Sequence, residues 1–138
     1  MTKKIIFVAA DKDYPTTLKA CEVLRPNYTL ITSVDPIEAI TALRGLDSVD
    51  LLITDYLLKA NKVFDRRWGE EMITEVHKYK PTMPAIYVPS GMMSSEFRRQ
   101  DLNKIIGRMR DIGVRVGYVG KPIKQDELEA KVREMIGE

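Results

Sequence analysis

The sequence predicts an α/β fold in which a parallel β-sheet is covered by helices on both faces. Short apolar runs alternate along the 138 residues with segments whose apolar residues recur at helical spacing. The runs are rich in Ile, Val, Leu and Tyr, the residues that favour buried strands. This regular alternation is typical of a parallel sheet with helices packed on its two faces.

The apolar runs and helical patterns define ten expected elements. The five strands are predicted at residues 5–8, 28–32, 50–54, 84–88 and 114–119. The five helices are predicted at residues 14–24, 36–43, 70–79, 102–112 and 127–136. Pro36 suits the first turn of its helix, and Leu128, Val132 and Met135 are spaced to lie on one face of the last helix.

Length, charge and cysteine content restrict the class of protein. No repeat, linker or low-complexity tract divides residues 1–138, so one domain without an output domain is expected. The net charge is +2 with 30% charged residues, which favours no polyanionic partner such as nucleic acid. A single cysteine, Cys21, suits a reducing compartment. No run approaches the roughly 20 apolar residues of a membrane span, and no signal peptide is recognisable, so a cytoplasmic protein is predicted.

Candidate functional residues follow the predicted strands. In parallel α/β sheets, ligands and chemistry belong at the carboxyl ends of the strands. These positions are Ala9, Ala10 and Asp11 after the first strand, Asp55 after the third, Pro89 and Ser90 after the fourth, and Lys121 after the fifth.

Four segments, taken in this order, resemble the receiver domain of two-component response regulators. They are "IIFVAADKD", "DLLITD", "MPAIYVPS" and "GYVGKPI". The resemblance runs from about Lys3 to Ile136. It implies a doubly wound, CheY-like or flavodoxin-like fold with five parallel strands in the order 2-1-3-4-5.

The resemblance also assigns roles to three residues. Asp55 matches the aspartate that accepts a phosphoryl group from a histidine kinase. Lys121 matches the lysine that contacts the acyl phosphate, and Tyr118 matches the aromatic residue whose rotation reports phosphorylation in that family.

Three positions depart from the receiver pattern. Ala9 and Ala10 stand where the family has two adjacent carboxylates that hold a divalent cation, and Pro89 stands where it has a switch Thr or Ser. Proline supplies neither a hydroxyl nor an N–H group. Ser90 replaces the missing hydroxyl only if the strand bulges, and Asp11 supplies one acid only if the first strand slips by one residue.

We therefore expect a stand-alone pseudo-receiver that is not an enzyme and acts through protein contacts. Its partner would be a histidine kinase or a downstream signalling protein, and no cofactor or metal is expected. One alternative is a genuine phospho-accepting regulator that binds Mg²⁺ through Asp11 and Asp55. A second is a flavodoxin-like protein that binds a small ligand outside signalling. Asp55 could also be a simple turn residue paired with Lys121.

Two insertions distinguish the chain from the usual receiver length. The segment from Lys59 to Trp68 enlarges the loop beside Asp55; a solvated loop is the simplest interpretation, and a partner contact is the alternative. The segment from Ser90 to Val114 is long and predicts one or two extra helical turns. A buried stripe is expected there, formed by Leu102, Ile105, Ile106, Met109 and Ile112.

No other single residue is predicted to form a functional site. His77 has no Cys or His partner in its neighbourhood of the sequence and is interpreted as a surface or packing residue. Cys21 falls near Leu18 and Leu24 on the first predicted helix, where a buried, inert thiol is expected. No Gly-rich phosphate loop is present, which argues against a nucleotide-binding enzyme.

Overall fold

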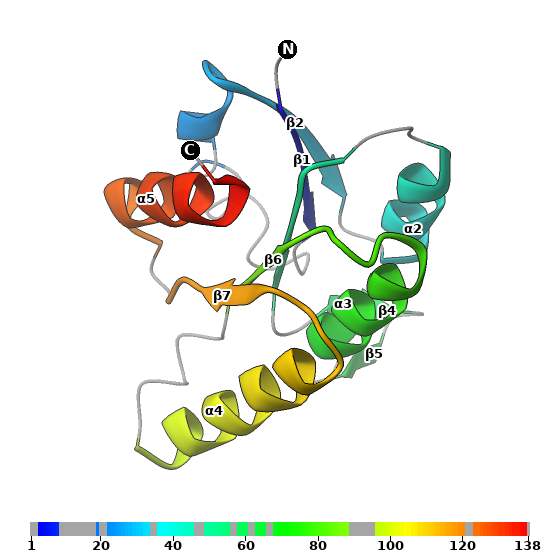
Figure 1. Ribbon diagram of the computed structural model, residues 1–138, viewed down its shortest axis with the longest axis vertical. Coiled ribbons are helices and arrows are strands. Elements are labelled where there is room, and N and C mark those ends of the chain that lie inside the picture. The colour runs from blue at the N-terminus through cyan, green and yellow to red at the C-terminus, as the bar shows by residue number, and fades with distance from the viewer. Residues whose placement is uncertain are drawn as a thin grey trace.

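A five-stranded parallel sheet forms the centre of the molecule (Figure 1). The computed structural model describes residues 3–8, 19, 22–33, 36–45, 49–55, 58–60, 63–65, 68–88, 96–120 and 123–137. The strands of this sheet are β1 (Lys3–Val8), β2 (Tyr28–Ser33), β3 (Leu51–Asp55), β6 (Ala85–Val88) and β7 (Val116–Tyr118). Their spatial order is β2-β1-β3-β6-β7, and every neighbouring pair is parallel. Counted along the chain, this is the predicted order 2-1-3-4-5, so the doubly wound fold is confirmed.

Helices cover both faces of the sheet. They are the 3₁₀ helix η1 (Glu22–Leu24) and the α-helices α2 (Pro36–Gly45), α3 (Trp68–Tyr79), α4 (Glu96–Asp111) and α5 (Gln125–Ile136). Helices α2, α3 and α4 pack against one face, and η1 and α5 pack against the other. Among the described residues, no helix combines the length and the apolar character needed to cross a membrane.

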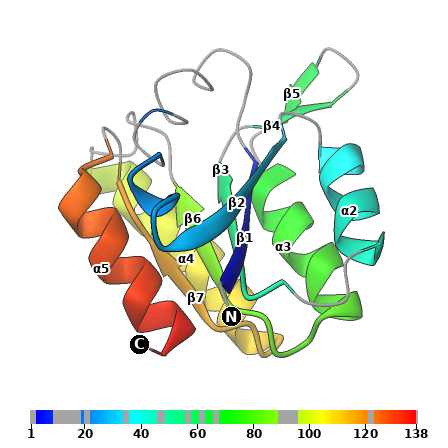
Figure 2. The same cartoon turned by 90° about the horizontal axis from the view of Figure 1, so that it is seen from above.

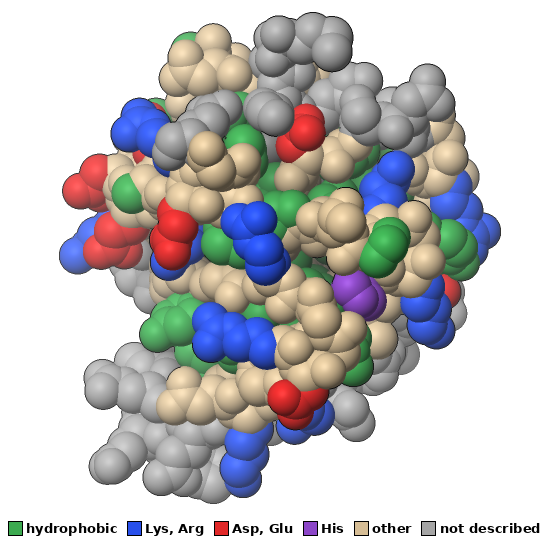
Figure 3. Space-filling model, viewed as in Figure 1, with side chains coloured by type: hydrophobic (Ala, Val, Ile, Leu, Met, Phe, Trp, Pro, Cys, Tyr) green, Lys and Arg blue, Asp and Glu red, His purple; other side chains and the backbone are tan. Residues whose placement is uncertain are grey.

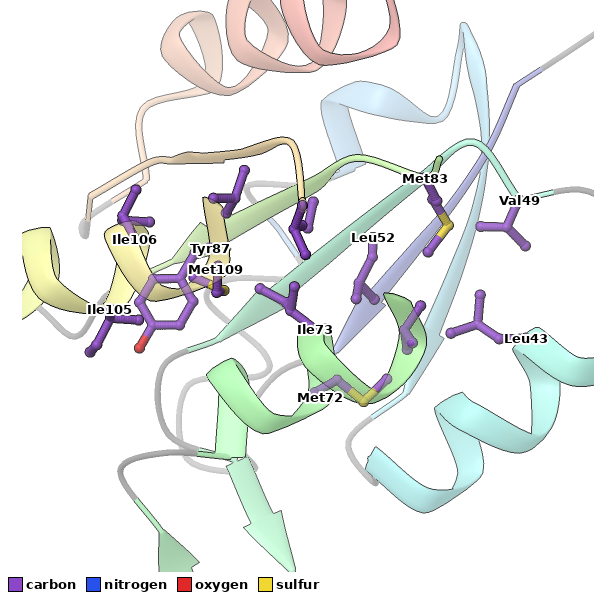
Figure 4. Packing of buried hydrophobic residues seen from close by; sticks show 14 of the residues in the cluster. Leu43, Val49, Leu52, Met72, Ile73, Met83, Tyr87, Ile105, Ile106 and Met109 are labelled. Carbon is purple, nitrogen blue, oxygen red and sulfur yellow. The ribbon is translucent and has the colours of Figure 1, made fainter. Parts of the chain in front are cut away.

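The two faces of each strand contribute to different cores because successive side chains of a strand point in opposite directions. Leu52 and Tyr87 join the core under α2, α3 and α4, part of which Figure 4 shows. Leu51, Ile53 and Ile86 join the core under α5, where Leu128, Val132 and Met135 are buried as their spacing predicted. Burial on both faces explains why these strands have near-continuous apolar sequences.

The strands run in the same direction, so the sheet has two chemically different edges (Figure 2). The carboxyl ends of all five strands lie at one edge, which we call the carboxyl edge. Their amino ends lie at the opposite edge, the amino edge, which faces the viewer in Figure 3. The α-helices lie on the faces of the sheet and run in the direction opposite to the strands, so they end at the amino edge.

Several predicted boundaries move by a few residues. The predicted strand 50–54 is observed one residue later, so Asp55 ends β3 instead of following it. Helices α4 and α5 begin earlier than predicted because their first turns are largely polar and lack the apolar period used to locate them. Helix α3 begins two residues earlier than predicted, at Trp68. The predicted strand 114–119 contracts to β7, although Val114 and Val119 are both buried.

The predicted helix 14–24 is described only in part. Its last three residues form η1, a 3₁₀ helix, so the prediction of an α-helix is wrong there. Lys19 is helical. The remaining residues of this prediction, including Cys21, lie outside the described residues.

A β-hairpin replaces part of the loop expected between Lys59 and Trp68. Strands β4 (Leu58–Ala60) and β5 (Val63–Asp65) pair antiparallel, with Ala60 opposite Val63. Strand β4 lies close to α2 and α3. The prediction of a solvated loop is therefore wrong at Lys59, Ala60 and Val63–Asp65, which are strand residues.

The stripe predicted on the fourth helix is correct for four of its five residues. Leu102, Ile105, Ile106 and Met109 are buried against the sheet. Ile112 is 46% exposed because α4 ends at Asp111 and the chain turns at Gly113, whose φ of 96° is left-handed. The prediction that Ile112 is buried is therefore wrong.

Ile106, which is buried, and Ile112, which is exposed, give a matched test of the packing of α4. Ile106→Ala should lower the free energy of unfolding by about 2–5 kcal/mol, because it opens a cavity in the core. Ile112→Ala should cost less than about 1 kcal/mol, because this side chain already contacts water. Urea denaturation of both variants measures the difference. Equal losses would contradict the observed end of α4.

Candidate functional site at the carboxyl edge

Asp55 lies at the middle of the carboxyl edge. It is the last residue of β3, the central strand, and its backbone pairs with Val88 at the end of β6. On the other side, Val8 at the end of β1 pairs with Thr54. The ends of β1 and β6 therefore flank the end of β3, and the strand end that carries Asp55 is the central one.

A row of paired residues crosses the sheet directly below Asp55. Val8 pairs with Thr54, Thr54 with Tyr87, and Tyr87 with Tyr118. Thr54 is fully buried. In the described part of the chain it is the one buried residue with a polar or charged side chain, apart from the tyrosines. This register places Tyr118 level with Thr54, one residue closer to the amino edge than Asp55.

The two tyrosines of this row have opposite environments. Tyr118 is 49% exposed, whereas Tyr87 is fully buried. Figure 4 shows the Tyr87 ring beside Ile105 and Met109 of α4. The N–H of Val119 donates to the carbonyl of Tyr87 at 3.1 Å, which holds the end of β7 to β6. The Tyr87 ring thus fills the space between the sheet and α4 that lies next to the exposed Tyr118.

Several predicted site residues cannot be placed. Lys121, Pro89 and Ser90, together with Ala9, Ala10 and Asp11, lie outside the described residues, as does the side chain of Asp55. Their order in the chain is nevertheless informative: they follow β7, β6 and β1 within a few residues. The structure thus brings together the strand ends from which these residues come.

Metal ligands and histidine chemistry find little support in the described part of the chain. No group of three or more His, Cys, Asp or Glu side chains gathers there. His77 is half-buried on α3, with a buried Nδ1 that has no hydrogen-bond partner, and its Nε2 faces the turn at Gly113. This is the environment of a packing residue.

The comparison with solved structures agrees with this geometry. No family model matches the sequence, and no curated protein matches it either. Among solved structures, the signal receiver domain of an HD domain-containing protein from Pseudomonas fluorescens superimposes with a TM-score of 0.71 at 20% identity, covering 99% of this chain and 96% of that one. The chain has the receiver-domain fold.

Two further structures superimpose on nearly the whole chain. A CheY-like response regulator receiver domain from Methanospirillum hungatei has a TM-score of 0.74 at 19% identity, over 99% of this chain and 95% of that chain. A structure described as an adenylate cyclase from Rhodopirellula baltica has a TM-score of 0.75 at 16% identity, over 99% and 89%. The receiver fold that the sequence motifs implied is therefore confirmed, and identities this low concern the fold alone.

Tyr87 is the site neighbour that the sequence analysis missed. Its strand "AIYV" was interpreted only as an apolar run. The signal was available: a large residue with a hydroxyl sits next to the end of a strand whose other members are aliphatic.

The contrast between the tyrosines is testable by chemical modification. Limited nitration of the folded protein should modify Tyr118 and spare Tyr87, because the reagent reaches exposed rings first. Peptide mapping by mass spectrometry identifies the modified residues, and the exposed Tyr79 serves as a positive control. Nitration of Tyr87 before Tyr118 would contradict the observed packing.

Proposed function

We propose that this chain is a receiver-type signalling module that acts through protein contacts, and that metal-dependent phosphorylation of Asp55 is weakened or absent. The observation that carries the proposal is the placement of Asp55 at the centre of the carboxyl edge of a receiver fold, next to a strand that continues into Ala9 and Ala10. The framework for a phosphoacceptor is present, and the residues that follow β1 lack the paired carboxylates.

The two missing carboxylate charges are important for phosphoryl transfer. A divalent cation neutralises the phosphoryl oxygens as they approach the attacking carboxylate, and it needs oxygen ligands to stay in place. At about 4 Å and an effective dielectric constant of about 20, each carboxylate attracts such an ion by roughly 8 kcal/mol before desolvation is subtracted. Loss of even a fraction of this attraction, twice, would weaken metal binding severely.

Two other features support a state that does not switch. Pro89 follows β6 where a hydroxyl is expected, and proline offers no donor to a phosphoryl group. The buried ring of Tyr87 lies between the sheet and α4, where an inward rotation of Tyr118 would bring a second ring. Close-packed interiors accept no extra aromatic ring without rearrangement, so we propose that Tyr118 stays outward.

The hairpin gives the proposed protein contact a location. Strands β4 and β5 come between Asp55 and α3 in the chain, and Figure 2 shows them at the carboxyl edge. Recognition residues are often carried by such insertions on a rigid scaffold. A histidine kinase or a downstream signalling protein is the proposed partner, in the cytoplasm, and no enzymatic activity or cofactor of the chain's own is required.

Incubation with acetyl phosphate and Mg²⁺ tests the proposal. The intact mass should stay unchanged, because Lys121 alone would not compensate the charges of Asp55 and the incoming phosphoryl group. The double variant Ala9→Asp, Ala10→Asp should gain a phosphoryl group on Asp55 by restoring the cation ligands. Intact-mass and peptide mass spectrometry measure both.

Asp55→Asn in each background is the matched control. A wild-type adduct that disappears in Asp55→Asn would overturn the proposal and identify a working phospho-accepting regulator, with Asp11 replacing one acid. An adduct absent even from the double variant would show that the two alanines are not the defect. Copurification of a small molecule that binds at the carboxyl edge would favour a flavodoxin-like binding protein instead.

A further inference from the structure

Two adjoining hollows lie at the amino edge, on the side of the sheet opposite Asp55. The larger has a volume of about 510 Å³ and is bordered by the connections that enter β3, β6 and β7. The smaller, about 400 Å³, lies between the end of α4, β7 and α5. Arg115 and Met135 line both, so the hollows meet at these two side chains. Volumes of this size are those of small-molecule sites.

Positive charge gathers at this edge for a reason that comes from the fold. The carbonyl ends of the helices point here, and their partial negative charge favours cationic side chains in the last turn. Basic residues occupy that turn in α2, α3, α4 and α5. Figure 3 shows Lys and Arg side chains (blue), with Asp and Glu side chains (red) among them, around a central region in which hydrophobic side chains (green) are visible.

Arg115 is held in place between the hollows. Its Nη2 donates to the carbonyl of Met135 at 2.7 Å, and its own carbonyl accepts from the N–H of Ala85 at 2.9 Å. The guanidinium has five N–H donors in a planar fork, which suits two-point contact with a carboxylate or a phosphate. The bond to Met135 fixes the side chain and leaves other donors of the fork for a ligand.

Each hollow adds a second cation and one carboxylate. Lys80 and Asp50 line the larger hollow. Arg110 and Glu134 line the smaller one; the Arg110 Nη2 donates to the carbonyl of Val116 at 3.2 Å. Glu134 pairs with Lys131 at 2.9 Å, which compensates its charge. An oxyanion near Arg115 would therefore meet a second positive group in either hollow.

Tyr79, which lines the larger hollow, belongs to a cluster of side chains at the ends of α2 and α3. The Arg44 guanidinium lies 4.4 Å from the centre of the Tyr79 ring and donates to its hydroxyl. That hydroxyl donates to Glu75 at 3.3 Å, and Lys78 donates to Glu75 at 3.1 Å. The hydrogen bond from Lys78 lowers the pKa of Glu75, so the carboxylate stays charged at neutral pH. The cluster orients Tyr79, whose side chain lines the hollow.

We propose that the amino edge binds a small organic oxyanion, with Arg115 as the main contact and Lys80 or Arg110 as the second. The group recognised is a phosphate or a carboxylate. The proposal does not depend on the signalling role of the carboxyl edge. Ligand occupancy there would link a metabolite to the end of the sheet that is remote from Asp55.

A titration monitored by amide chemical shifts in NMR tests this site. The probes are ribose 5-phosphate for the phosphate arm and citrate for the carboxylate arm, with ribose as the neutral match, all at constant ionic strength. At least one oxyanion should give saturable shifts at Thr82, Gly113 and Ile136, and ribose should give none. Arg115→Gln should weaken the binding about tenfold or more, because it removes a charged hydrogen-bond donor.

The controls separate this site from general charge effects and from misfolding. Arg133→Gln removes the same charge from α5, where Arg133 pairs with Glu129 at 3.6 Å and lines neither hollow, and it should change affinity less than twofold. Lys80→Gln provides a second lining variant if Arg115→Gln does not fold. Asp55→Asn should bind as the wild type does. No saturable shift with either oxyanion, equal binding of ribose, or unchanged affinity in both lining variants would overturn the proposal.

Discussion

Parallel pairing of β3 between β1 and β6 is the constraint on which the rest of the molecule depends. Parallel neighbours need a crossover that returns the chain to the starting edge, and here helices make that return. Every strand of the five-stranded sheet therefore ends at the carboxyl edge, and the α-helices end at the amino edge. The position of Asp55 and the concentration of basic side chains at the opposite edge are both consequences of this one arrangement.

The carboxyl edge combines the strand order of a receiver fold with a sequence that departs from the receiver pattern at Ala9, Ala10 and Pro89. Below Asp55, the backbone-paired residues Val8, Thr54, Tyr87 and Tyr118 cross the sheet, and the Tyr87 ring is buried against α4. In the proposed account, this buried ring holds one state of the domain, since it occupies the space that a mobile aromatic residue would need. A partner would then recognise a fixed surface that includes the β4–β5 hairpin.

The sequence predicted the fold well because the central strands, β3 and β6, are buried on both faces. Runs such as "LLITD" and "AIYV" admit few other interpretations once helical patterns separate them. Short or irregular elements were less visible. The strands of the hairpin have three residues each, too few for a period to emerge, and η1 is too short to distinguish from the end of an α-helix.

The location of candidate residues was predictable only where chain position decides it. Asp55 was selected because a strand end is recognisable, although the strand proved to include it. The packing of Tyr87 against α4 and the exposure of Ile112 depend on where α4 ends and how it lies on the sheet. Likewise, Arg115 became a candidate ligand contact only through its bond to Met135, twenty residues away in the chain. Such long-range relations have no periodic signature in a single sequence.

The central claim, that the carboxyl edge lacks a functional cation site, is tested most directly by titrating the protein with Mg²⁺. Trp68 is the single tryptophan of the sequence and begins α3 at this edge, so its fluorescence reports on the neighbourhood of Asp55. The account predicts no saturable change in the low millimolar range. A saturating change that Asp55→Asn abolishes would contradict it.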